Sequence, residues 1–130
     1  MINERYENGW KMLMEVDGEG GKRVIESLKD IAPDLGKYVI EFAFGDIYTR
    51  EGLNLQQKQL VTISSLTTQG GCEPQLHVHI NAALNVGLTP QEIVEAITHC
   101  IPYTGFPRVL NAIFIAKQVF TERKLTVTLK

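Results

Sequence analysis

Hydrophobic side chains recur every three or four positions along most of the chain, which is the period of an amphipathic helix. Glycines interrupt this pattern: the cluster Gly18, Gly20 and Gly21 is predicted to end the first helix, and Gly52 the third. From Lys124 to Lys130 the residues alternate between apolar and polar, which favours a short strand or an extended arm. The class is therefore predicted to be all-α with six or seven helices, over about residues 3–16, a short segment around 24–31, 33–48, 55–68, 74–86, 90–100 and 107–123.

Local capping signals mark several of these boundaries. Asn54 with Gln57, and Thr89 with Glu92, have the spacing of a capping box, so helices are expected to begin directly after Asn54 and Thr89. Pro102 is expected to end the helix that begins at Pro90. The segment 103–107, Tyr-Thr-Gly-Phe-Pro, is then predicted to be a turn that leads into the last helix.

The last predicted helix, residues 107–123, is apolar on nearly all sides. More than one face of such a helix must be covered, because exposed apolar surface is costly in water. Another subunit could supply part of this cover.

The stretch Gly70 to Gly87 combines a cysteine, a proline and two histidines with an amphipathic helix. Pro74 suits the first helical position, with Cys72 or Glu73 as the cap, and a helix N-terminus favours thiolate over thiol. At about 100° per residue, Cys72 and His79 fall within roughly 20° of each other. Gln75 lies close to the same line, whereas His77 points elsewhere. The pattern predicts a thiol and an acid/base group on one helix face.

Composition narrows the function classes. The chain has 130 residues, 44% of them hydrophobic, with a net charge of −2, so we expect one domain over residues 1–130. Its charges are spread without a basic run, which argues against a nucleic-acid partner, and no long apolar run suggests a membrane span. We expect a cytoplasmic protein. Two cysteines and three histidines lack zinc-site spacing, so no metal or cofactor is predicted, and cysteine chemistry, if present, is catalytic or redox.

The order of residues from about 40 to 120 resembles the carboxymuconolactone decarboxylase family, which is similar in fold to the alkylhydroperoxidase D group. This resemblance implies an all-helical bundle with a helical hairpin at its centre, assembled into a ring-like homo-oligomer, a trimer or hexamer. The segments that carry it are Phe44 to Tyr48, Leu60 to Ile63, Leu76 to His79, Ala83-Leu84, Gly87 to Thr89, Glu92 to Glu95, Tyr103 to Pro107 and Asn111-Ala112.

Two activities occur among relatives of this kind. In the decarboxylase branch the resemblance implies a cofactor-independent lyase acting on a small carboxylated lactone, with His79 as general acid/base. In the peroxidase-like branch a C-x-x-C pair precedes the histidine. Here Cys72 and His79 match, but Gln75 replaces the second cysteine, so an intramolecular disulfide cannot form there. Lys58-Gln59 stands where the family usually has Arg-Glu, which replaces a titratable acid by a neutral amide.

The remaining candidates are polar residues expected to shape a small-molecule pocket, namely Gln59, Gln75, Glu95, Tyr103 and Asn111. Two alternatives to the lyase stay open. Cys72 could act as a single peroxidatic cysteine with Cys100 or an external thiol resolving it, or the protein could be a non-catalytic oligomeric binder. Some of these residues could instead have structural roles. A free cysteine is usually a core residue, and His77 and His99 are expected to be structural.

Overall fold

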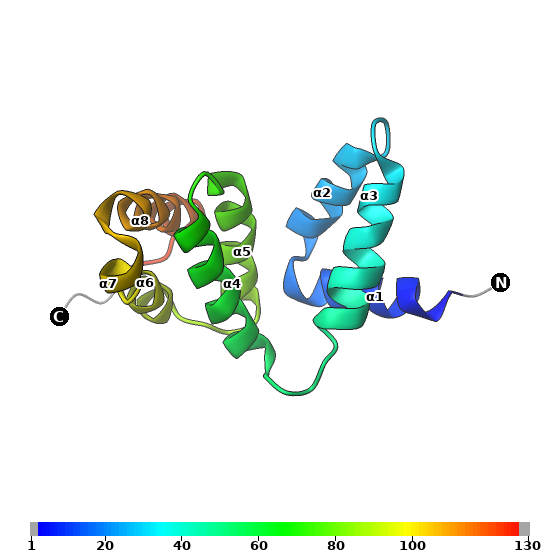
Figure 1. The fold of residues 1–130 in the computed structure, drawn as a ribbon, viewed down its shortest axis with the longest axis horizontal. Helices are drawn as coiled ribbons and strands as arrows, with labels where there is room; N and C mark the ends of the chain where they lie inside the picture. Colours follow the sequence, from blue (N-terminus) through cyan, green and yellow to red (C-terminus); the bar gives the residue numbers. More distant parts are fainter. Residues whose placement is uncertain (1–2, 128–130) are drawn as a thin grey trace. The chain divides into compact units, whose positions relative to one another are not determined.

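A computed structural model describes residues 3–127 of the chain, and every regular element within that range is a helix. The predicted all-α class is therefore confirmed for these residues. The chain divides into two compact units, Met1–Leu55 and Gln56–Lys130, whose helices are labelled in Figure 1. No helix within residues 3–127 combines the length and the apolar character needed to cross a membrane. The prediction that the whole chain folds as one domain stays a prediction.

The first unit contains α1 (Glu4–Val16), α2 (Glu19–Leu28), α3 (Pro33–Tyr38) and η1 (Val39–Ile47). The side chain of Asn3 caps α1 by accepting a hydrogen bond from the Tyr6 backbone N–H. Helix α3 begins at Pro33, as predicted, and continues without a break into η1, which is a π-helix. Its wider i→i+5 winding ends with the Tyr48 N–H donating to the Ala43 carbonyl at 2.9 Å. The predicted helix over residues 33–48 is thus present, but with a π winding that local sequence did not indicate.

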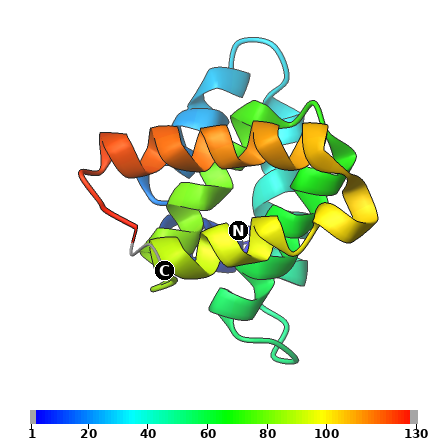
Figure 2. The ribbon, with the colours of Figure 1, turned by 90° about the vertical axis from the view of Figure 1, so that its left-hand side faces the viewer.

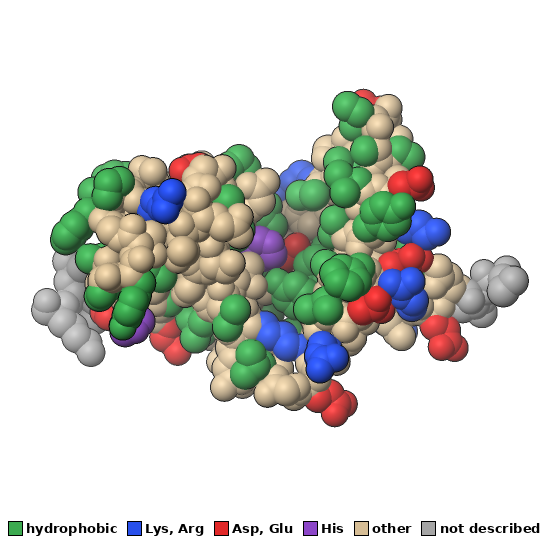
Figure 3. Space-filling view, viewed as in Figure 1, with side chains coloured by type: hydrophobic (Ala, Val, Ile, Leu, Met, Phe, Trp, Pro, Cys, Tyr) green, Lys and Arg blue, Asp and Glu red, His purple; other side chains and the backbone are tan. Residues whose placement is uncertain are grey.

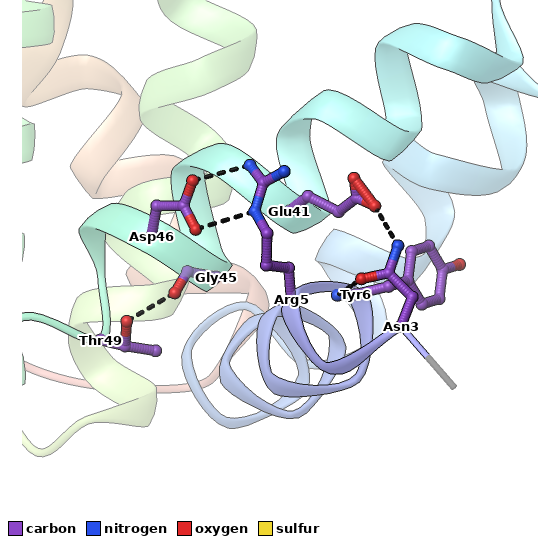
Figure 4. A network of polar contacts seen from close by, with 7 residues as sticks. All are labelled: Asn3, Arg5, Tyr6, Glu41, Gly45, Asp46 and Thr49. Atoms are coloured by element: carbon purple, nitrogen blue, oxygen red, sulfur yellow. Dashed lines mark hydrogen bonds and ion pairs between the residues drawn. The ribbon is translucent and has the colours of Figure 1, made fainter. Parts of the chain in front are cut away.

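Helix α1 packs against η1 at two glycines. A Cβ on Gly9 would overlap the backbone carbonyl of Ile40, and a Cβ on Gly45 would lie 2.7 Å from the Arg5 carbonyl oxygen. Polar contacts beside this crossing connect the same two helices (Figure 4): Arg5 pairs with Asp46 at 2.7 Å, and Asn3 donates to Glu41 at 2.6 Å. The small size of the two glycines is what lets the backbones approach so closely.

The prediction that Gly18, Gly20 and Gly21 together end the first helix is wrong. Only Gly18, with φ 59, lies between helices; Gly20 and Gly21 are inside α2. A Cβ on Gly21 would lie 2.6 Å from Cβ of Asp17, so this glycine allows the start of α2 to lie close against the end of α1. Ile31, predicted to be on the apolar side of the second helix, follows the end of α2 and is 81% exposed.

Asp17, directly after α1, is a buried carboxyl group. Its Oδ1 has no hydrogen-bond partner within residues 3–127, and burial raises the pKa of Asp17 to about 7. Loss of the proton leaves a charge in an environment that solvates it poorly.

Stability is therefore expected to depend on pH through Asp17. The pKa is about 7 in the folded protein and 3.8 in the reference state, so the folded protein binds the proton more tightly. The free energy of unfolding should fall as pH rises from about 4 to 7, at roughly 1.4 kcal/mol per pKa unit. Urea denaturation of wild type and Asp17→Asn at several pH values measures this. If both proteins show the same pH dependence, Asp17 is not its source.

The second unit contains α4 (Leu55–Gln69), α5 (Glu73–Asn85), α6 (Pro90–Thr98), α7 (Ile101–Thr104) and α8 (Phe106–Glu122). The side chain of Gln56, at the start of α4, donates to the Val86 carbonyl just beyond α5, so these two helices run antiparallel. Helix α8 contacts α5, α6 and α7 (Figure 2). Its buried face and neighbouring helices form one apolar core of Ile63, Leu76, Ile80, Ala83, Leu88, Ile93, Ile97, Cys100, Val109, Ala112, Ala116, Val119 and Phe120.

The predicted boundaries in this unit are mostly confirmed. The capping box of Thr89 and Glu92 is present, and α6 begins at Pro90. Helix α5 begins at Glu73, one residue before Pro74, which makes Cys72 its N-cap residue. Gly87, predicted as a helix C-terminal residue, has φ 102 and follows the end of α5.

Two predictions near the C-terminus are wrong in part. Tyr103 and Thr104 are not in a turn, because Pro102 lies at the start of the short helix α7 and the chain reverses only at Gly105, with φ 92. No strand forms over residues 125–127, although Val127 packs against the core. The rest of the predicted strand or arm, residues 128–130, lies outside the described residues.

Candidate active site

His79 lies in the middle of α5 and is only partly accessible to solvent. Its Nδ1 is 3.4 Å from Oε1 of Gln59 on α4. An amide oxygen only accepts hydrogen bonds, so the imidazole donates through Nδ1–H and the lone pair lies on Nε2. Within residues 3–127, Nε2 has no hydrogen-bond partner of its own. One ring nitrogen is therefore held by the protein and the other is available to a ligand.

Burial lowers the pKa of His79 to about 4, because the protein solvates the imidazolium less well than water does. The ring is thus neutral at pH 7. A neutral imidazole with an available Nε2 can accept a proton from a bound acid, and once protonated it is a strong proton donor.

Gln59 is fully buried in α4, one turn before the core residue Ile63. Besides its bond to His79, Gln59 takes part in a further interaction. Among the predicted site residues within the described part of the chain, Gln59 and His79 are the pair that the structure brings into contact.

Cys72 makes different contacts. Its Sγ donates to the Gly70 carbonyl at 3.4 Å and to Oε1 of Gln69 at 3.7 Å. Both partners are acceptors, which suit an S–H group and offer nothing to a thiolate. Cys72 and His79 are seven residues apart, which is about 10 Å of rise along a helix axis. Cys72 is the N-cap residue of α5, and its hydrogen bonds and those of His79 go to different partners.

The other predicted pocket residues lie on the surface of the second unit. Gln75 is exposed in the first turn of α5, and Glu95 is exposed on α6, where it accepts a hydrogen bond from Gln91 at 2.9 Å. Tyr103 is 80% exposed at the end of α7, and Asn111 is exposed on α8. The contacts within residues 3–127 do not join these four side chains to His79, and their roles in a pocket stay predictions.

His77 and His99 occupy positions that agree with structural roles. Nε2 of His77 is 2.7 Å from Glu122 at the end of α8. His99 follows α6, is exposed, and its ring lies 6.0 Å from that of Tyr103. Arg123 adds a second link between α8 and α5 by donating to side-chain oxygens of Asn81 and Asn85.

Sequence reasoning did not identify Asp17, whose carboxyl pKa is raised to about 7 by burial. The available signal was Gly21, four residues later, whose lack of a side chain lets α2 cover the carboxyl group. Within residues 3–127, no group of three or more His, Cys, Asp and Glu side chains is arranged to hold a metal ion.

Comparison with known proteins identifies relatives of this chain by sequence. The sequence profile of the carboxymuconolactone decarboxylase family matches residues 33–118. A 4-carboxymuconolactone decarboxylase of Acinetobacter baylyi is 36% identical over 120 residues, which cover 92% of this chain and 89% of that protein. A nitrosuccinic acid decarboxylase of Metarhizium robertsii is 27% identical over 120 residues, covering 90% of this chain and 82% of that protein. An uncharacterised 15.0 kDa protein of Paracoccus denitrificans is 33% identical over 99 residues, covering 75% and 74%. The resemblance predicted from the sequence is confirmed.

Proposed function

Because the chain belongs to the carboxymuconolactone decarboxylase family, we propose that it is a lyase that removes carbon dioxide from a small carboxylated lactone or a related acid. In this proposal His79 is the general acid/base. The observation that carries it is the neutral, partly buried imidazole whose Nδ1 is bonded to Gln59 and whose Nε2 is available. The names of two relatives, both decarboxylases, support the reaction class.

The chemistry requires little beyond proton transfer. When the bond between the carboxylate and its carbon breaks, carbon dioxide leaves and the electron pair passes into the conjugated lactone as an enolate. The lactone itself stabilises this charge, so the reaction as proposed needs no cofactor. A proton must then reach carbon to complete the product.

His79 can supply that proton. A substrate carboxylate near Nε2 favours the imidazolium, because an opposite charge stabilises the protonated ring. The ring would take one proton from solvent, deliver it to the enolate carbon and return to its neutral form. The low pKa of the free site, about 4, makes the imidazolium a strong acid for this step.

Carbon dioxide release from purified protein tests the proposal, with 4-carboxymuconolactone and nitrosuccinic acid as the first two substrates because relatives are named for them. Turnover of either one supports the lyase. No turnover together with Cys72-dependent peroxide reduction would replace it by the thiol peroxidase. Tight binding of these acids without turnover would replace it by the non-catalytic binder.

We also propose that the outer face of α8 contacts a second copy of the chain. Three large apolar side chains repeat there at four-residue spacing: Phe106 is 62% exposed, Leu110 46% and Phe114 60%. Side chains of this kind gather over the region of α7 and α8 in Figure 3. Their size and regular spacing are typical of a helix face that packs against another protein surface.

Phe114→Lys is expected to reduce the oligomer to a smaller species, because it places a charge within this apolar face. Light scattering coupled to gel filtration measures the mass. Thr98→Lys, which adds the same charge at an exposed position at the end of α6, is the control and should leave the mass unchanged. A wild-type monomer, or an unchanged mass in Phe114→Lys, would contradict the proposal.

A further inference from the structure

We propose that Gln59 is a positioning residue that sets the tautomer of His79, keeping the ring proton on Nδ1 and the lone pair on Nε2. The effect on catalysis rests on the proposed lyase function, whereas the tautomer itself does not. The sequence prediction placed Gln59 among substrate-binding residues. Its complete burial and its bond to His79 indicate a different role, that of orienting the group that meets the substrate.

The position of Gln59 relative to His79 is fixed by the packing of α4 on α5. Three residues earlier, Gln56 donates to the Val86 carbonyl at 3.1 Å, so a second hydrogen bond joins the start of α4 to the end of α5. At 3.4 Å the bond between Gln59 and His79 is long for a hydrogen bond and contributes little energy. It nevertheless orients the imidazole ring, because Nδ1 must face the amide oxygen. A ring whose Nδ1 has an acceptor in place is biased toward the Nδ1–H tautomer.

Several charged groups of the second unit have contacts other than His79. His77 pairs with Glu122, Glu95 accepts from Gln91, and Arg123 donates to Asn81 and Asn85. The guanidinium of Arg108 lies against Gly70, at the opposite end of α4 from Gln56. Within the described residues, the acceptor for the Nδ1–H of His79 is a neutral amide oxygen, which selects a tautomer without favouring the charged ring.

The identity of this residue matters because glutamate at the same place would act differently. A carboxylate would also accept from Nδ1–H, but its charge would stabilise the imidazolium and raise the pKa of the ring. Leucine has a similar volume and accepts nothing. The three side chains thus separate the effects of shape, hydrogen bonding and charge.

Nitrogen-15 NMR of the histidine side chains tests the proposal directly, with His79→Gln used to assign the signals. In wild type we expect Nδ1 of His79 to have the shift of a protonated nitrogen and Nε2 that of an unprotonated one. In Gln59→Leu the two shifts should move toward each other as the second tautomer becomes populated. Gln59→Glu should keep the Nδ1–H pattern and move the titration midpoint of His79 to higher pH. Gln69→Leu, an exposed glutamine of the same helix, is the control and should change neither.

The proposal fails if wild type carries its proton on Nε2, or if Gln59→Leu leaves the Nδ1–H pattern intact. If Gln59→Leu does not fold, the direction of the midpoint in Gln59→Glu decides: a rise supports the contact, and no movement contradicts it. If the protein turns over a substrate, Gln59→Leu should lower kcat by about 10–100-fold, the effect that loss of a hydrogen-bond partner has at metal-bound histidines. Correct tautomers without any turnover would remove the lyase proposal and leave the role of Gln59 standing.

Discussion

His79→Gln is expected to lower kcat/KM for decarboxylation by about 10²–10⁴-fold, which is the usual contribution of a positioned general acid/base. Glutamine keeps a polar side chain of similar reach but cannot take up and return a proton. The imidazole Nδ1 is bonded to Gln59 and the ring is neutral at pH 7, so proton transfer through Nε2 is the property that the substitution removes. The measurement is steady-state carbon dioxide release at pH 7.

Two variants make this result specific. His99→Gln changes an exposed histidine that follows α6 and should leave kcat/KM unchanged. Cys72→Ser separates the lyase from the thiol peroxidase: we expect normal decarboxylation, because the Sγ of Cys72 donates to Gly70 and Gln69 rather than to His79. Full activity in His79→Gln would show that this imidazole is not the acid/base.

Gly9→Ala is expected to destabilise the first unit strongly, by about 1–3 kcal/mol or more. The new Cβ would overlap the carbonyl group of Ile40 in η1, and a backbone atom cannot move aside as the end of a flexible side chain does. Helix α1 would have to shift away from η1 and disturb the Arg5 to Asp46 ion pair. Urea denaturation gives the change in the free energy of unfolding.

Gly20→Ala is the matched control for this effect. Gly20 is also helical, but the nearest atom to its added Cβ is Nη2 of Arg23 at 4.0 Å. Alanine there should be neutral or stabilise by up to about 1 kcal/mol, because it restricts the unfolded chain. Equal stabilities for the two variants would show that the close approach of α1 and η1 is not required.

Features set by a few neighbouring residues could be predicted from the sequence. The capping box of Thr89 and Glu92 was predicted correctly because every group in it lies within one helical turn. His79 was identified from the family resemblance and from its position on an amphipathic helix. The start of α3 at Pro33 followed from the fixed φ of proline.

Features set by packing could not be predicted in this way. The rotation of about 100° per residue predicts a common direction for Cys72 and His79, but it takes no account of their separation along the helix axis. The π winding of η1 and the close approach at Gly9 depend on helices that are distant in sequence. Exposure of Tyr103 and Asn111 likewise depends on which side of α7 and α8 faces the core.

The links between α5 and α8 bear on the order in which this protein forms during synthesis. Helix α5 carries His79, yet its polar links to the end of α8 come from Glu122 and Arg123, which lie 38 to 45 positions later than the residues they contact. A ribosome releases the chain from its N-terminus, so α4 and α5 emerge before these partners exist. The helix that holds the imidazole therefore acquires its final attachments only after α8 has been translated, and a chain stopped before Glu122 would carry every predicted site residue without them.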